Sequence, residues 1–249
     1  LSAMLAVNAA GMASPPLFLY PTKNCPRSFV NQIPIGDWGV LPTGSGWMTG
    51  SAFILWLQSF ADYLDLKVRS DPMERHILIL DGHATHHSVA AAELAESRNI
   101  ALFFLPPHTT HFLQPMDVSL FGPFKAAFAR QVDIWMREHP VEKCTLLTIP
   151  PLICSAWKKA VTKRNIVSGF VATGICPLSP ERGLSFVDSL AVSTSPEFDS
   201  DMIAQAIAAL RADAPRFATR NEALRGIVTP SSLGIWTPQV STVVEDGNQ

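Results

Sequence analysis

The stretch from residue 76 to residue 107 constrains the fold more than any other part of this chain. It contains two short apolar runs, HILILDGH and ALFFLPP, with SVAAAELAESRN between them. Apolar runs that end in Asp-Gly or in two prolines are typical of buried strands, and Ser88 is a good N-cap for the intervening helix. Two strands joined through a helix are normally parallel, with a right-handed crossover. The sequence therefore predicts an α/β fold.

The flanking sequence predicts further strands and helices. Residues 1–20 predict two short strands, and residues 21–50, rich in Pro, Gly and Asn, predict a loop. From Thr49 onward, apolar residues recur at helical spacing. Three more helices are expected, from Gly122-Pro123 to about Glu138, from Pro150 to Lys163, and over residues 166–173.

The composition changes after Pro180, which predicts a boundary between a domain over residues 1–180 and a tail over residues 181–249. The tail holds nine acidic residues and five arginines and is enriched in Ser, Thr and Pro. One helix, over residues 199–212, is expected there, and the remainder is expected to be an acidic, low-complexity tail.

The overall composition excludes several classes of protein. Apolar residues make up 47% of the 249 residues and charged residues 16%, so the chain can bury a core and is not a disordered polyelectrolyte. The formal net charge of −2 excludes DNA binding by bulk charge alone. Four scattered cysteines without a CxxC pair indicate reduced thiols. Glycines and prolines interrupt both uncharged stretches, so no membrane span or signal peptide is predicted.

Two acidic residues stand where such a fold would expose them. Asp81 follows the apolar residues of the first predicted strand, and Asp117 follows the loop that leaves the second. The carboxyl ends of parallel strands meet at one edge of a sheet, where α/β proteins build their sites. If the two carboxylates converge there, Mg²⁺ is the cation that suits their oxygens. Each also has an ordinary structural explanation, since Asp-Gly is a common turn and Asp a common helix cap.

The motifs around these carboxylates extend over much of the chain. After Asp81-Gly82-His83 the sequence reads PPHTTH at 106–111, LQPMD at 113–117 and FGPFK at 121–125, with GICPL at 174–178. In this order, with 35 residues between the two carboxylates, they resemble the DDE superfamily endonuclease domain of pogo-like transposases, the group that includes Tigger and Jerky-type proteins. The resemblance covers about residues 3–180, and Met116 replaces the family's usual Leu.

The resemblance implies an RNase H-like mixed sheet flanked by helices and a two-metal site for Mg²⁺ or Mn²⁺ that cuts and joins DNA. Asp81 and Asp117 match the family's second and third catalytic carboxylates and would be metal ligands. The first carboxylate lies on a first strand ahead of the counterpart of Leu1. That strand and carboxylate, and the helix-turn-helix modules before them, are expected to be missing from this chain, which leaves the two-metal site incomplete.

The resemblance also implies partners and a location. The expected partners are DNA and, in an oligomer, further copies of the chain or related transposase chains, with no membrane and no small-molecule substrate. The expected location is the nucleus. The competing hypothesis is a catalytically dead, domesticated or relic protein that binds DNA or other chains without cutting, so whether the chain is an enzyme stays open.

Two further sets of residues each have a functional and a structural explanation. Five histidines at the same predicted edge could share a zinc ion or could fix loops and contact phosphate; they are His83, His86, His87, His108 and His111. Between residues 120 and 165, eight Lys or Arg stand against three acidic residues, which favours either a DNA-binding face or an ordinary solvated helix surface. The candidate DNA-binding residues are Lys125, Arg130, Lys158, Lys159, Lys163 and Arg164.

Overall fold

The computed structural model describes residues 1–33, 38–71, 73–82, 86, 88–105 and 109–182, together with the backbone of 235–242. The helix expected over residues 199–212 lies outside these residues, and so do His83, His87 and His108.

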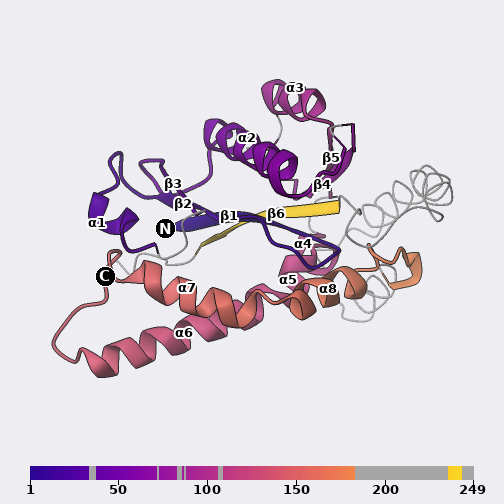
Figure 1. Cartoon of the computed structure of the whole chain (residues 1–249). Helices are drawn as coiled ribbons and strands as arrows, with labels where there is room; N and C mark the ends of the chain where they lie inside the picture. Colours follow the sequence, from indigo (N-terminus) through magenta and orange to yellow (C-terminus); the bar gives the residue numbers. More distant parts are fainter. Residues whose placement is uncertain are drawn as a thin grey trace, which may run out of the picture.

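A mixed six-stranded sheet forms the centre of the fold (Figure 1). Its order is β3 (Gly39–Pro42), β2 (Leu17–Tyr20), β1 (Ser2–Asn8), β6 (Ile235–Thr242), β4 (His76–Leu80) and β5 (Ile100–Phe104). β1 is antiparallel to both β2 and β6, whereas β2–β3, β4–β5 and β4–β6 are parallel pairs. The predicted mixed α/β class is confirmed, and so are the two strands expected within residues 1–20.

The predicted strand–helix–strand unit is present as β4, α3 (Val89–Ser97) and β5. The two strands are parallel and in register from His76↔Ile100 to Leu80↔Phe104. Ser88 caps α3, because its side-chain oxygen accepts a hydrogen bond from the Ala91 N–H at 3.1 Å. The helix ends at Ser97, and Asn99, with a positive φ of 53°, then turns the chain into β5.

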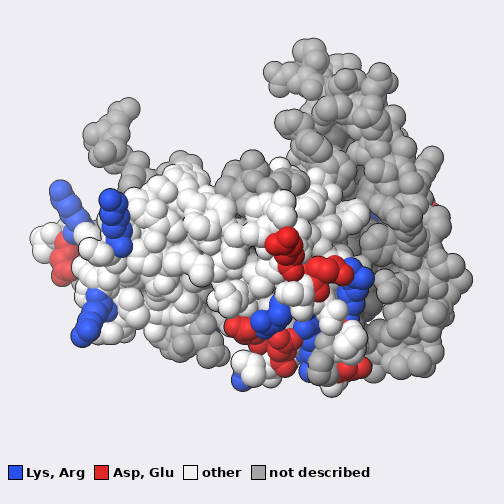
Figure 2. All heavy atoms as spheres, turned by 90° about the horizontal axis from the view of Figure 1, so that it is seen from above, with Lys and Arg blue, Asp and Glu red and all other residues white. Residues whose placement is uncertain are grey.

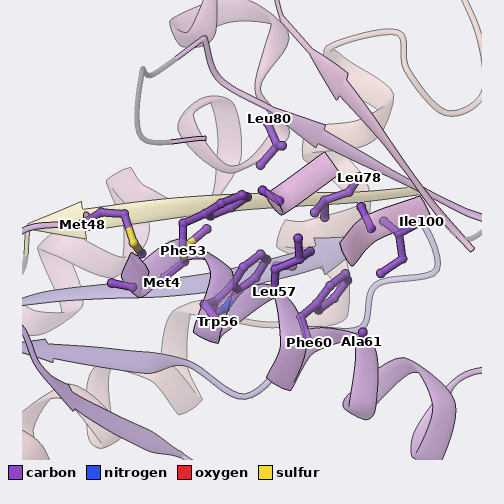
Figure 3. Packing of buried hydrophobic residues seen from close by; sticks show 14 of the residues in the cluster. Met4, Met48, Phe53, Trp56, Leu57, Phe60, Ala61, Leu78, Leu80 and Ile100 are labelled. Atoms are coloured by element: carbon purple, nitrogen blue, oxygen red, sulfur yellow. The ribbon is translucent and has the colours of Figure 1, made fainter. Parts of the chain in front are cut away.

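One face of the sheet is covered by α2 (Gly50–Lys67) and α3 (Figure 1). The Thr49 hydroxyl caps α2 by accepting from the Ala52 N–H at 3.2 Å. The apolar face of α2 then packs against alternate residues of the strands, as Figure 3 shows. This core includes Met4, Leu78, Leu80 and Ile100 from the sheet and Phe53, Trp56, Leu57 and Phe60 from α2.

The other face is covered by the helices that follow β5 (Figure 1). They are α4 (Thr110–Leu113), α5 (Pro115–Ser119), α6 (Phe121–Glu138), α7 (Ile149–Ala160) and α8 (Lys163–Ala172). Strand residues point alternately to the two faces of the sheet, so the neighbours of Met4 and Ala6 in β1 point toward these helices. Leu5 and Val7 pack there with Met116 and Phe170. β1 is therefore buried along its whole length between two helical layers.

Two sequence predictions need correction at their boundaries. The helix expected from Pro150 to Lys163 ends at Ala160, and α8 starts at Lys163 rather than at residue 166. The reason is a local cap, because the Thr162 hydroxyl accepts a hydrogen bond from the Asn165 N–H at 3.2 Å. Residues 21–50 are also more than a loop: they contain β3 and α1 (Arg27–Val30), whose Phe29 is fully buried.

β6 comes from the segment that the sequence predicts to be a tail. Its backbone pairs with all seven residues of β1, from Ser2↔Thr242 to Asn8↔Trp236. It pairs with β4 at two positions, Ile77↔Ile235 and Leu78↔Trp236. Nothing in the sequence of 235–242 predicts a central strand, because Pro238 normally confines a strand to an edge.

Cysteine reactivity provides a test of this packing. Cys154 in α7 is 2% exposed, and burial raises the pKa of its thiol to about 11 against a smaller opposite effect of Lys158. At pH 8 the thiol is therefore almost entirely protonated and unreactive. We expect iodoacetamide to modify the exposed Cys144 quickly and Cys154 only after unfolding, measured by peptide mass spectrometry. Equal rates at the two cysteines in the native protein would contradict the packing of α7.

Candidate active site

Asp81 lies directly after β4, at the carboxyl end of the parallel pair. The β4–β5 ladder continues up to this point, since the Leu105 N–H donates to the Leu80 carbonyl at 2.7 Å. The Asp81 side chain is 26% exposed, and its Oδ1 lies 2.8 Å from Nδ1 of His86. His86 is itself 3% exposed and packs on the ring of Phe53, with centroids 4.6 Å apart. A buried imidazole held by the core therefore orients the carboxylate.

Asp117 lies in the first turn of α5. Gln114, which is fully buried, precedes the helix, and its carbonyl accepts from the Asp117 N–H at 3.1 Å. Pro115 occupies the first helical position, where a missing N–H costs nothing. Met116 is fully buried in the cluster that contains Leu5. Asp117, the next residue of the helix, is partly exposed. The first turn of α5 therefore places Met116 in the core and Asp117 at the surface.

The position of α5 is fixed by close contact with α8. A Cβ atom on Gly169 would lie 2.3 Å from the Pro115 carbonyl oxygen and 2.4 Å from Ser119 Oγ, so only glycine permits this approach. Ser119 Oγ also donates to the Asn165 carbonyl at 2.7 Å. The helix that carries Asp117 thus rests on α8 at both of its ends. Sequence analysis missed this supporting residue, although a glycine in the middle of a predicted helix signals close packing.

The described contacts of the two acidic residues lead to different helices. Asp81 lies beside His86, which packs on Phe53 of α2. Asp117 belongs to α5, which follows α4 on the opposite side of the sheet, where Ile79 packs with Phe112 and Leu113. That the two carboxylates converge therefore remains a prediction. Their role as metal ligands remains a prediction: within the described ranges, no three His, Cys, Asp or Glu side chains form a group suited to a metal ion.

The zinc hypothesis remains a prediction as well, because three of its five histidines lie outside the described residues. Of the other two, His86 contacts Asp81 as described above, and His111 in α4 lies edge-on to the Phe112 ring at 4.5 Å.

The six candidate DNA-binding residues are all exposed and all come from α6, α7 and α8, below the sheet in Figure 1. None of the six forms an ion pair in the described part of the chain. Lys163 and Arg164 stand in the first turn of α8, where the helix dipole favours anions over cations. The side-chain carbons of Lys163 pack on Gly11, whereas the charges of Lys163 and Arg164 gain no stability from the helix dipole.

The opposite side of the molecule has a different charge pattern. Figure 2 looks down on α2 and α3, where acidic and basic side chains are intermixed. They pair with one another: Arg69 Nη1 lies 2.5 Å from Asp65 Oδ1, and Arg98 bonds to Asp62 and Asp65. These charges are satisfied within the protein, which leaves the α6–α8 side as the candidate DNA-binding face.

Comparison with known families supports this geometry. The family model described as DDE superfamily endonuclease matches residues 1–170, a range that contains Asp81, Asp117 and the helices that position them. This chain belongs to the DDE superfamily endonuclease family. Metal dependence and a DNA partner are typical of that family.

A curated protein from Cochliobolus lunatus, named MFS-type transporter clz9, is 33% identical over 182 residues, which are 73% of this chain and 19% of that protein. The chain thus spans about a fifth of the length of this relative. No solved structure matches the chain. Within the described residues, no helix combines the length and apolar content that crossing a bilayer requires.

Proposed function

We propose that this chain is the RNase H-like endonuclease domain of a pogo-like transposase, acting on DNA in the nucleus. The observation that carries the proposal is the pair of carboxylates within the family match. Asp81 follows β4 and Asp117 lies in α5, both within the residues that match the DDE superfamily endonuclease model, and the motifs around both resemble those of the transposase group.

The chemistry of the donor set fits divalent metal ions. Carboxylate oxygens are the ligands that Mg²⁺ and Mn²⁺ prefer, and Asp81 and Asp117 would hold the ion. When bound, such ions activate an attacking water or DNA 3′-hydroxyl and stabilise the leaving oxygen. The contribution of His86 is positional, because its ring fixes one oxygen of Asp81 from within the core.

DNA would lie along α6–α8, next to α5. Removing the two first-turn cations of α8 tests this arrangement, because the change should weaken DNA binding without lowering the stability of the fold. Lys163→Gln with Arg164→Gln removes both charges, and Gln at 163 retains the carbon that packs on Gly11. We expect the slope of log affinity against log salt to decrease by about 2, because two phosphate contacts are lost. The melting temperature should not fall, because the two cations oppose the helix dipole.

The matched control is Lys67→Ala, an exposed cation on the opposite, α2 side. It should leave DNA affinity unchanged in the same fluorescence-anisotropy titration. A loss from Lys67→Ala about half as large as that from the α8 pair would show that binding follows total charge and not this face, because Lys67→Ala removes one charge and the pair removes two.

A second candidate function is DNA binding without cleavage. It is favoured by one observation: in the described part of the chain, Asp81 and Asp117 are not joined by a third acidic residue in a metal-binding group. Nicking of supercoiled plasmid distinguishes the two functions. The endonuclease function predicts nicking with Mn²⁺ and not with EDTA. DNA binding without nicking under either condition would favour the binding function.

A further inference from the structure

Trp47, in the loop before α2, presents an exposed aromatic ring. Its side chain is 58% exposed, whereas every other Phe, Tyr and Trp side chain in the described part of the chain is buried or half-buried. One exposed aromatic residue needs no explanation by itself. Its position relative to the candidate active site gives it a meaning.

Trp47 lies at the same edge of the sheet as Asp81. β6 is parallel to β4, β1 is antiparallel to β6, and β2 is antiparallel to β1, so the carboxyl ends of β2 and β4 share one edge. A Cβ atom on Gly46 would lie 3.1 Å from Cβ of Pro21, the residue that follows β2. Three strand spacings separate β2 from β4 in the sheet, a distance of about 15 Å.

The first turn of α2 connects Trp47 with the surroundings of Asp81. Met48, the next residue, and Phe53 point into the same core (Figure 3). Phe53 is the residue on which His86 packs, and His86 contacts Asp81. The described neighbours of Asp81 and the loop that carries Trp47 thus belong to one side of the sheet edge, the α2 side.

The backbone on both sides of Trp47 is held in place, although the ring is exposed. Before it, the Gly46 N–H donates to Thr43 Oγ1 at 3.0 Å. After it, Met48 is buried and Thr49 caps α2. A ligand that binds the ring therefore does not have to order this loop, which lowers the entropic cost of binding.

The surroundings of Trp47 favour a nucleobase over a phosphate as its ligand. No charged residue occurs between Trp38 and Ala61, so this segment offers no cation to a phosphate. An aromatic ring stacks on any base, and one such stack raises affinity by about tenfold. The base must be unpaired, because a base within a duplex is already stacked between its neighbours.

We propose that Trp47 is a stacking site for an unpaired base of the DNA strand on which Asp81 and Asp117 act. The inference rests on the proposed function, because its ligand is part of the DNA bound along α6–α8. The basic face holds phosphates, and Trp47 fixes a base on the α2 side of the edge. At about 3.4 Å per nucleotide of one strand, this base lies about four nucleotides from Asp81.

Fluorescence anisotropy with two DNAs tests the stacking site. One is a blunt duplex, and the other is the same duplex with a single-stranded 3′ extension of thymidines. We expect Trp47→Ala to weaken binding of the extended DNA about tenfold and to leave binding of the blunt duplex unchanged. Trp47→Phe should retain most of the affinity, because Phe also stacks on bases. The slope of log affinity against log salt should not change, because no phosphate contact is lost.

Two controls separate stacking from other effects. An extension of the same length made of abasic nucleotides keeps the phosphates and removes the bases. The unsubstituted protein should bind it as weakly as Trp47→Ala binds the thymidine extension. Leu55→Ala removes another exposed apolar side chain, in α2, and should change the affinity for neither DNA.

The outcomes distinguish this inference from the proposed function. Unchanged affinity of Trp47→Ala for the extended DNA would overturn the stacking site alone, provided that Lys163→Gln with Arg164→Gln still weakens binding of both DNAs. Failure of the unsubstituted protein to bind either DNA would contradict the stacking site and the proposed function together. Self-association that Trp47→Ala abolishes, with unchanged DNA affinity, would assign Trp47 to a protein contact and overturn the inference.

Discussion

Gly169→Ala is expected to lower the free energy of unfolding by about 3 kcal/mol, the upper part of the range for overpacking substitutions. The added methyl carbon would meet the Pro115 carbonyl oxygen at 2.3 Å and Ser119 Oγ at 2.4 Å. Backbone cannot move aside as a flexible side chain can, so α5 and α8 must separate. Asp117 moves with α5. Urea unfolding followed by circular dichroism measures the change.

The chain offers a matched control for this substitution. Gly122 also lies in a helix, α6, but a Cβ atom there would meet nothing within 4 Å apart from its neighbours in the chain. Gly122→Ala should therefore change the free energy of unfolding by less than about 1 kcal/mol, because the helix preference of Ala is offset by the contact of its Cβ with the ring of Pro123. The same chemical change thus has very different expected effects at the two positions. A Gly169→Ala variant as stable as Gly122→Ala would contradict the described contact between α5 and α8.

Asp81→Asn and Asp117→Asn are each expected to reduce Mn²⁺-dependent nicking of DNA by about 100-fold or more. Asn keeps the shape of the side chain but removes the charge that holds the cation. Because both residues act on the same ions, the double variant should be little worse than either single variant. DNA affinity should change little, since α6–α8 stay intact.

The control for this series is Asp133→Asn, an exposed acidic residue of α6. Its activity should equal that of the unsubstituted protein. Full nicking activity in Asp81→Asn or Asp117→Asn would remove these residues from the site, and an effect of Asp133→Asn of the same size would point to a general effect of charge.

Local sequence was sufficient to predict the central elements of the fold. The strand–helix–strand unit was predictable because its two apolar runs, its Ser88 cap and its terminating prolines all favour the same structure. α2 and α6 followed from helical periodicity and from the signals at their starts. Asp81 and Asp117 could be proposed as site residues because one follows a predicted strand and the other lies near the start of helical sequence, each within a recognisable motif; their role stays a prediction.

The parts that were missed depend on contacts between segments distant in sequence. Phe29 makes α1 and β3 part of the core by packing on Tyr20, with ring centroids 4.8 Å apart, which the Pro- and Gly-rich sequence around it does not indicate. The pairing of His86 with Asp81 depends on Phe53 in α2. β6 was unpredictable because its own sequence disfavours a central strand. Its placement depends on backbone pairing with β1 and β4, which are distant in sequence.

The most direct test of the central claim, that Asp81 and Asp117 together hold a divalent cation, is a calorimetric titration of residues 1–249 with Mn²⁺. The account predicts a saturable site whose affinity falls at least about tenfold in Asp81→Asn and in Asp117→Asn, because each removes one charged ligand. The double variant, which removes both charged ligands, should bind more weakly than either single variant, and Asp133→Asn should bind as the unsubstituted chain does. Mn²⁺ binding that is unchanged by both single substitutions would contradict the account.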